Sequence, residues 1–292
     1  MVDAHTLTLG LIGDPVDHSL SPRLHGHLLR ALGVNGCYHA FRVRRPELAA
    51  AVAGLKALGI RGVNVTIPHK EAILPLLDKL SEEARAVGAV NVVANERGRL
   101  LGYNTDVCGV ELALKRHGVN AAGAHAVILG AGGAARAVVW TLMKMKAATV
   151  RIHSRSTDRR EKLAAELANG GRATALVPAP WEDAALAESL ATATLLVNAT
   201  PCGMWPNQQE SPVRAELLRE GLVVFDLVYN PLRTVLVQEA ARAGAHVIAG
   251  LDMLIFQAME AMVIWTGRRA PDADHLIEQL SVALSEELAQ NG

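Results

Sequence analysis

A lysine and an aspartate in two short polar stretches are the residues of this chain best suited to proton chemistry. Lys70 ends the stretch Asn-Val-Thr-Ile-Pro-His-Lys at residues 64–70, and Asp106 ends Asn-Thr-Asp at residues 104–106. A lysine that is partly desolvated beside a carboxylate can donate or accept a proton near neutral pH. Either residue alone is more often a surface charge. Their occurrence together predicts a catalytic pair.

A glycine-rich turn, Gly-Ala-Gly-Gly-Ala-Ala at residues 130–135, follows an expected strand and opens an expected helix. Its glycines permit a tight turn and a close backbone approach, and the free amides at the helix start suit a pyrophosphate. A turn in this context predicts dinucleotide binding, by Gly130, Ala131, Gly132, Gly133 and Ala134. A nicotinamide bound there would move hydride while the lysine and aspartate move the proton.

The end of the next strand bears on the choice between NAD and NADP. An NAD site usually has an acidic residue there, about 20 residues after the glycine-rich turn. This chain has Ser154, Arg155 and Ser156, with Arg159 close behind. Guanidinium groups suit a doubly charged 2′-phosphate, although these residues could also form a solvated basic helix start that Asp158 partly neutralises. The pattern favours NADP and leaves NAD open.

Other polar side chains suit a small hydroxylated acid as the substrate. Ser19 and Ser21 flank an expected helix start, where two hydroxyls and exposed amides could bind a carboxylate, although one of them could simply cap the helix. Thr66 and Asn91 could hold sugar-like hydroxyls or serve as turn residues. Gln257 lies among apolar residues of an expected helix, where its amide needs a partner from the substrate or from the protein.

Several other chemistries are not expected. His25 and His27 stand two residues apart on an expected helix and point to different faces, so they do not suggest a metal site. His69 is better explained by packing or solvation, and no Ser-His-Asp order suggests a hydrolase. The three cysteines are far apart and show no zinc-binding spacing, which indicates a reducing compartment.

The charge of the chain is balanced, with 29 basic and 29 acidic side chains. This balance gives no electrostatic reason to expect nucleic acid or an anionic membrane as a partner. No signal peptide is evident, and the apolar stretch at residues 251–267 is shorter than a bilayer span. We therefore expect a cytoplasmic protein with a small-molecule substrate. A homodimer is possible, and the sequence leaves the oligomeric state open.

Strands and helices alternate along the chain, and these elements must position the residues named above. In the first third, strands are expected at residues 7–12, 38–43 and 62–67, helices at 23–32, 46–58 and about 70–80, and a hairpin at 89–103. A helix at 108–116 leads into strands at 125–129, 149–153, 173–177, 194–198, 223–227 and 246–248, with polar loops near 169–172 and 206–212. Helices at 252–266 and about 272–289 finish the chain. The alternation predicts an α/β fold with mostly parallel pairing, in which a doubly wound Rossmann-type domain follows an N-terminal α/β domain.

Taken in order, the motifs resemble those of the shikimate dehydrogenase family, which includes quinate/shikimate dehydrogenases. They are His-Ser-Leu-Ser-Pro at 18–22, the stretch at 64–70, Gly-Ala-Val-Asn at 88–91, Asn-Thr-Asp at 104–106, the glycine-rich turn, Asn-Ala-Thr-Pro-Cys-Gly-Met at 198–204, Asp-Leu-Val-Tyr-Asn-Pro at 226–231 and Gly-Leu-Asp-Met-Leu-Ile-Phe-Gln at 250–257. They extend over nearly the whole chain and are specific when they occur together.

The resemblance implies reversible, NADPH-dependent reduction of 3-dehydroshikimate to shikimate in chorismate and aromatic amino-acid biosynthesis. Residues 1–107, completed by the helices of 251–292, would form the substrate-binding and catalytic domain, and residues 108–250 the NADP-binding domain. Lys70 and Asp106 would be catalytic. The implied substrate residues are Ser19, Ser21, Thr66, Asn91, Asp106, Tyr229 and Gln257. Those implied for the cofactor, besides the glycine-rich turn, are Ser154, Arg155, Ser156, Arg159, Thr200, Met204, Val228, Gly250 and Met253.

The sequence departs from the family pattern at Ser154 and Ser156, where Asn and Thr are common, and this makes the choice of cofactor less secure than the fold. A serine at position 21 is more similar to the shikimate-preferring members than to the quinate-preferring ones. Three alternatives are an NAD-dependent quinate/shikimate dehydrogenase of catabolism, a non-catalytic dinucleotide-binding sensor, and an enzyme acting on an amino-substituted analogue of shikimate.

Overall fold

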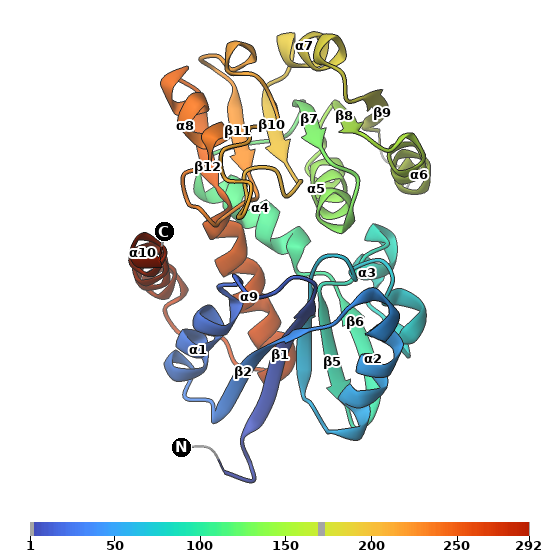
Figure 1. Ribbon diagram of the computed structural model, residues 1–292, viewed down its shortest axis with the longest axis vertical. Coiled ribbons are helices and arrows are strands. Elements are labelled where there is room, and N and C mark those ends of the chain that lie inside the picture. Colours follow the sequence, from blue (N-terminus) through green and yellow to red (C-terminus); the bar gives the residue numbers. More distant parts are fainter. Residues whose placement is uncertain (1–2, 169–172, 292) are drawn as a thin grey trace. The chain divides into compact units, whose positions relative to one another are not determined.

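The computed structural model describes residues 3–168 and 173–291, with side chains up to residue 288. The predicted polar loop at 169–172 lies outside the described residues. The described chain forms two compact units, each with an α/β architecture (Figure 1). One unit comprises the chain up to Thr105 together with Ile255–Gln290, and the other comprises Asp106–Leu254. None of the described helices combines the length and apolarity needed to cross a membrane.

The first unit is built on a six-stranded sheet in the order β2-β1-β3-β5-β6-β4. The strands are β1 Leu7–Gly13, β2 Gly36–Arg42, β3 Gly62–Val65, β4 Lys79–Leu80, β5 Val92–Glu96 and β6 Arg99–Tyr103. The helices are α1 Ser21–Ala31, α2 Leu48–Ala57, α3 Glu82–Val87 and α10 Ala273–Asn291, with most of α9 Gly250–Thr266 and the short 3-10 helices η1 Arg45–Glu47 and η2 Leu74–Leu76.

The pairing in this sheet is mixed. β1 lies parallel to β2 and β3, and β4 lies parallel to β6. β5 is antiparallel to both β3 and β6, which forms the hairpin predicted around residues 96–98. One face of the sheet is covered by α2, α3 and η2, whose apolar side chains form a common core with Val63, Val93 and Leu100.

The helix predicted at about residues 70–80 is wrong. That segment contains only the 3-10 helix η2 before β4 pairs with β6, because Pro75 removes a backbone donor and clashes with a continuing helix. The sequence prediction also missed α3. Ser81 caps that helix by accepting from the Ala84 N–H at 3.0 Å, and Gly88 ends it in the left-handed region with φ of 70°. Both are ordinary helix boundary signals.

The second unit contains a six-stranded sheet in the order β12-β11-β10-β7-β8-β9, and all its pairings are parallel. The strands are β7 His125–Leu129, β8 Thr149–Ser154, β9 Ala175–Pro180, β10 Leu195–Asn198, β11 Val223–Asp226 and β12 His246–Ala249. The helices are α4 Asp106–Arg116, α5 Gly133–Lys144, α6 Thr157–Ala168, α7 Asp183–Ala191 and α8 Val235–Arg242, with η3 at Ala215–Leu217. This is the doubly wound Rossmann order, which confirms the predicted fold class.

Gly62 provides a test of packing in the first unit. A Cβ added there would overlap the buried indole of Trp265 and lie 2.8 Å from the Val93 carbonyl oxygen, to which the indole N–H donates at 3.0 Å. We expect Gly62→Ala to lower the free energy of unfolding by about 1–3 kcal/mol, as overpacking of a buried site usually does. Urea titration measures the change.

Gly54→Ala is the matched control, because nothing lies within 4 Å of a Cβ added at this position of α2. Alanine is also the better helix former, so this variant should be neutral or more stable by roughly 0.5–1 kcal/mol. Equal loss of stability in the two variants would contradict the close approach between Gly62 and Trp265.

Candidate functional site

A buried side-chain amide, that of Asn91, joins three segments of the first unit. Its Oδ1 atom accepts from the Thr105 backbone N–H at 2.7 Å, and its Nδ2 atom donates to the Thr105 hydroxyl at 3.0 Å. Nδ2 also lies 3.3 Å from Gln257 Oε1, and the Asn91 carbonyl accepts from Asn64 Nδ2 at 3.2 Å. All four side chains are buried. The structure therefore brings together Asn91 and Gln257, two predicted substrate residues that are far apart in sequence.

An aromatic stack supports Asn64 within the same unit. The Tyr38 hydroxyl donates to Asn64 Oδ1 at 2.7 Å. The His25 ring lies parallel to that of Tyr38, with 4.2 Å between centroids, and is tilted against Trp265 at 5.4 Å. Burial lowers the pKa of His25 to about 3, and the neighbouring Asn64 side chain opposes this shift to a smaller extent. His25 is therefore a neutral residue that packs against Tyr38 and Trp265.

Ser19 and Ser21 lie at the start of α1, but neither is its cap. The helix begins at Ser21, and its N-cap residue is Leu20, which has no side-chain acceptor. The predicted start at residue 23 and the predicted serine cap are both wrong, because the turn before the helix directs Ser19 Oγ to the Ser21 N–H at 3.2 Å. The Ser21 side chain is buried and takes no part in capping, which is compatible with ligand binding.

Thr66 and Lys70 lie on a turn after β3 and not at the expected helix start. The His69 N–H donates to the Thr66 carbonyl at 2.9 Å, and the Lys70 carbonyl accepts from the Val90 N–H at 2.8 Å. The His69 side chain is buried, and its Nε2 atom donates to the Val43 carbonyl at 2.6 Å. His69 thus has a structural role, and Lys70, which is half-buried, is positioned by the turn rather than by a helix.

Asp106 and Tyr229 belong to the second unit. Asp106 is buried and is the first residue of α4. Tyr229 is half-buried in the loop that follows β11. The predicted substrate residues are therefore divided between the two units, and Asp106 stands where the chain passes from one unit to the other.

The order of strands in the second unit reverses between β7 and β10, and open parallel sheets bind their ligands at such switch points. Gly130 follows β7 with φ of 110°, and a Cβ added there would lie 3.0 Å from the Ala199 carbonyl oxygen. Gly132 precedes α5 without offering a side-chain cap, and nothing lies within 4 Å of a Cβ added to it. The turn thus has both the uncapped amides and the open space that a pyrophosphate requires.

In the loop after β8, the serines and the arginines have different roles. Ser154 Oγ accepts from the Ser156 N–H at 3.3 Å, and Ser156 Oγ accepts from the Arg159 N–H at 3.4 Å. Arg160 points to its own loop, where it donates to the Ser154 carbonyl at 2.9 Å. Arg155 and Arg159 are exposed, and within the described chain neither takes part in an ion pair. The serines order the loop, whereas these two arginines can meet an anion.

A buried carboxylate, that of Asp226, organises the loops after β10 and β11. It accepts from Asn198 Nδ2 at 2.9 Å and from the Thr234 hydroxyl at 2.6 Å. Asn198 Oδ1 in turn accepts from the Thr200 N–H at 3.1 Å and from its hydroxyl at 2.6 Å. Burial raises the pKa of Asp226 to about 6, and the donors hold it below the value that burial alone would give. The predicted cofactor residue Thr200 is therefore fixed through Asp226.

Val228 and Gly250 also come together in the second unit. A Cβ added to Gly250 would lie 2.5 Å from the Leu227 carbonyl oxygen and 2.9 Å from that of Val228, so only glycine lets α9 begin this close to the loop after β11. Of the other predicted cofactor residues, Met204 is half-buried in the loop after β10 and Met253 is buried in α9.

An open parallel sheet with a glycine-rich turn at its switch point defines the second unit as a dinucleotide-binding domain. The family profile for the shikimate dehydrogenase substrate binding domain matches residues 11–93, and the profile for the shikimate 5'-dehydrogenase C-terminal domain matches residues 250–280. A curated shikimate dehydrogenase (NADP(+)) of Moorella thermoacetica is 47% identical over 276 residues, which cover 93% of this chain and 92% of the relative. The chain belongs to the shikimate dehydrogenase family.

Solved structures agree with this assignment. The shikimate 5-dehydrogenase of Thermus thermophilus in complex with NADP(H) and shikimate is 38% identical, with a TM-score of 0.82 over 95% of this chain and 100% of that one. The quinate dehydrogenase of Corynebacterium glutamicum in complex with NAD is 32% identical, with a TM-score of 0.84 over 95% and 99% of the two chains. The family and the α/β fold predicted from the sequence are confirmed.

The sequence alone did not identify the residues that hold the predicted substrate and cofactor residues in place. Asn198 and Asp226 each end an apolar strand with a fully buried polar side chain, and this pattern could have identified them. Thr105 lies inside a recognised motif but was assigned no role. Tyr38 gave no signal, because its partners are brought to it only by folding.

Buried His25 should make the stability of the folded chain depend on pH. Its pKa of about 3 lies below the ordinary value of 6.5, so between these values the unfolded chain binds a proton that the folded chain does not. The contribution of His25 to stability is complete above the ordinary pKa and is lost as the pH falls, at roughly 1.4 kcal/mol per pH unit. We expect His25→Phe to remove this slope in urea titrations between about pH 7 and pH 5.

Asp226 acts in the opposite direction, because its raised pKa favours the folded state as the pH falls from about 6. Comparison of His25→Phe with the unsubstituted protein at each pH cancels that contribution. His5→Gln replaces an exposed histidine and should keep the original slope. If His25→Phe also kept it, the neutral state of buried His25 would be disproved.

Proposed function

We propose that the chain catalyses the reversible, NADPH-dependent reduction of 3-dehydroshikimate to shikimate. The near-full-length relationship to curated NADP(+)-dependent shikimate dehydrogenases carries this proposal. The buried amide cluster around Asn91 supports it, because a site for a hydroxylated ring needs polar partners that are fixed in advance. In this assignment Ser19 and Ser21 bind the carboxylate, while Thr66, Asn91, Asp106, Tyr229 and Gln257 hold the ring hydroxyls.

Lys70 and Asp106 are the proposed proton-transfer pair. The bound cofactor supplies the hydride that adds to the ketone carbon. Lys70 donates a proton to the ketone oxygen as this becomes a hydroxyl, and in the oxidation direction Lys70 takes the proton back. Asp106 accepts a hydrogen bond from a substrate hydroxyl and orients the lysine ammonium. Thr105 precedes Asp106 directly and is tied to Asn91, which restricts the chain just before the aspartate.

The proposed cofactor site uses the loops that follow β7 and β8. The amides of the turn at residues 130–134 bind the pyrophosphate, and Arg155 and Arg159 bind the 2′-phosphate of NADP. Ser154 and Ser156 order the arginine-bearing loop, and Thr200, Met204, Val228, Gly250 and Met253 surround the nicotinamide end. The uncapped start of α5 and the exposure of both arginines support this assignment.

Initial rates of the unsubstituted protein and of Lys70→Ala, with shikimate and NADP, test the reaction and its proton carrier together. A positioned proton donor is typically worth roughly 10²–10⁴-fold in rate. We therefore expect Lys70→Ala to lower kcat by about that factor, with unchanged NADP binding measured by fluorescence. Lys115→Ala, which changes an exposed lysine of α4, is the control. Unchanged kcat in Lys70→Ala would remove Lys70 from the mechanism.

The same assay with quinate and NAD separates the alternatives. A preference for quinate and NAD would favour a catabolic quinate/shikimate dehydrogenase. Cofactor binding without turnover of either acid would favour a sensor, and turnover confined to an amino-substituted analogue would identify a different substrate.

The cofactor assignment predicts a selective effect of Arg155→Ala. Loss of a charge-assisted hydrogen bond of about 1.5–3 kcal/mol corresponds to roughly a 10- to 150-fold rise in the KM for NADP. The KM for NAD should not change, because NAD lacks the 2′-phosphate. Lys162→Ala removes a neighbouring exposed charge of α6 and should alter neither constant. Equal effects of Arg155→Ala on both cofactors would refute the proposed contact.

A further inference from the structure

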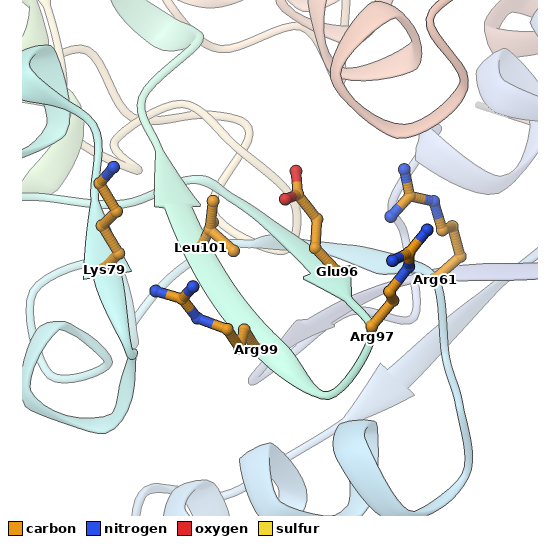
Figure 2. A pocket seen from close by; sticks show the side chains of 6 residues that line it. All are labelled: Arg61, Lys79, Glu96, Arg97, Arg99 and Leu101. Carbon is orange, nitrogen blue, oxygen red and sulfur yellow. The ribbon is translucent and has the colours of Figure 1, made fainter.

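A basic depression lies on the first unit at the turn of the β5–β6 hairpin (Figure 2). It has a volume of about 730 Å³ and is lined by Arg61, Lys79, Glu96, Arg97, Arg99 and Leu101. Four of these side chains are cationic and one is anionic, so the lining carries a formal charge of +3. Because the chain as a whole has no net charge, this excess is local to the depression.

Leu101 is the apolar residue of the lining. Figure 2 shows Lys79 and Arg99 on one side of Leu101, with Arg61, Glu96 and Arg97 on the other. In the part of the chain that the structure describes, none of the four cations forms an ion pair. A cluster of unpaired like charges raises the free energy of the folded chain, and a bound anion would relieve that cost.

Arg61 is held in position by the backbone. Its Nε atom donates to the Trp265 carbonyl at 2.9 Å, and its Nη1 atom donates to the Asn95 carbonyl at 2.7 Å. Two anchored donors fix the plane of the guanidinium and leave its Nη2 group for another acceptor. Little side-chain entropy would therefore be lost when Arg61 binds an anion.

Arg97 occupies a position that its residue type does not favour. Its φ is 54°, and Gly98 follows with φ of 86°, so the two residues form the turn of the hairpin. Asparagine, aspartate or glycine would suit the first of these positions better. An arginine in the left-handed region is strained, because its Cβ lies too close to the following carbonyl oxygen. Strain of this kind is common at binding sites.

The nearest acids do not neutralise the depression. Asp78 is close enough for Arg99 to lower its pKa, but its main partners are Lys56 at 2.8 Å and the Leu100 N–H at 2.6 Å. Glu96 lies in the lining itself. Burial raises the pKa of the neighbouring Tyr103 most, the charge of Glu96 raises it further, and Arg61 lowers it. One carboxylate therefore faces four cations.

We propose that this depression binds a small anion carrying two or more phosphate groups. Three guanidinium groups offer the forked donors that match phosphate oxygens, and the volume is in the range of small-molecule sites. The site is distinct from the substrate cluster. Asn91 precedes β5 and Glu96 ends it, so the extended chain between them spans roughly 17 Å.

Isothermal titration with sodium tripolyphosphate at constant ionic strength tests the proposal. Arg155→Ala should serve as the starting protein, because the proposed cofactor loop could also bind this probe. We expect saturable binding near one equivalent, which Arg97→Asn combined with Arg99→Thr should weaken about 10-fold or more. Asparagine suits the turn and threonine suits a strand, so this double variant should fold.

Arg30→Gln combined with Arg45→Gln is the control, because it removes two exposed charges elsewhere in the same unit and should leave the affinity unchanged. Equal weakening by the two double variants would mean general charge attraction and would overturn the site. The absence of saturable binding to Arg155→Ala would also overturn it. The readout does not use turnover, so failure of the proposed reaction leaves this test intact.

Discussion

The side-chain amide of Asn91 is the interaction on which the organisation of the first unit depends. It links residues separated by 14 and by 166 positions in the sequence, namely Thr105 and Gln257. Removing a partner from such a buried network leaves a polar group unsatisfied, at a cost of about 1–3 kcal/mol. The amide also fixes which atom of Gln257 accepts and which donates. The hydrogen bonds of this buried network thus stabilise the fold and orient groups that could bind a polar ligand.

Asp226 has the corresponding role in the second unit, with a carboxylate in place of an amide. Its partners Asn198 and Thr234 determine the loop that carries Thr200 and the start of α8. A carboxylate binds its donors more strongly than an amide does, but desolvation brings its pKa close to neutrality. In both units, a buried polar side chain thus forms hydrogen bonds with several segments of the chain. The carboxylate of Asp226 can change its charge with pH, whereas the amide of Asn91 cannot.

The family fold supports more than one cofactor and substrate. The two solved relatives named above are a complex with NADP(H) and shikimate and a complex with NAD. A shared scaffold can carry different sites, so differences of this kind reside in the site residues. In this chain the loop after β8 combines serines that bond its own backbone with Arg155 and Arg159 at the surface, which is the feature that favours a phosphorylated dinucleotide.

The sequence determined the α/β class, the parallel pairing of the second sheet and the motif positions, because strand periodicity, glycine turns and polar strand ends are local signals. It misassigned residues 70–80, where a helix-like apolar pattern is overridden by Pro75 and by pairing of β4 with β6. Only the tertiary structure determined that Asn91 meets Gln257, that Tyr38 supports Asn64, and that four cations gather around Leu101. The first two contacts join segments that are far apart in the sequence, and they exist because folding must satisfy buried polar groups wherever their partners lie. The four cations come together because strand pairing sets β3 and β4 beside the β5–β6 hairpin.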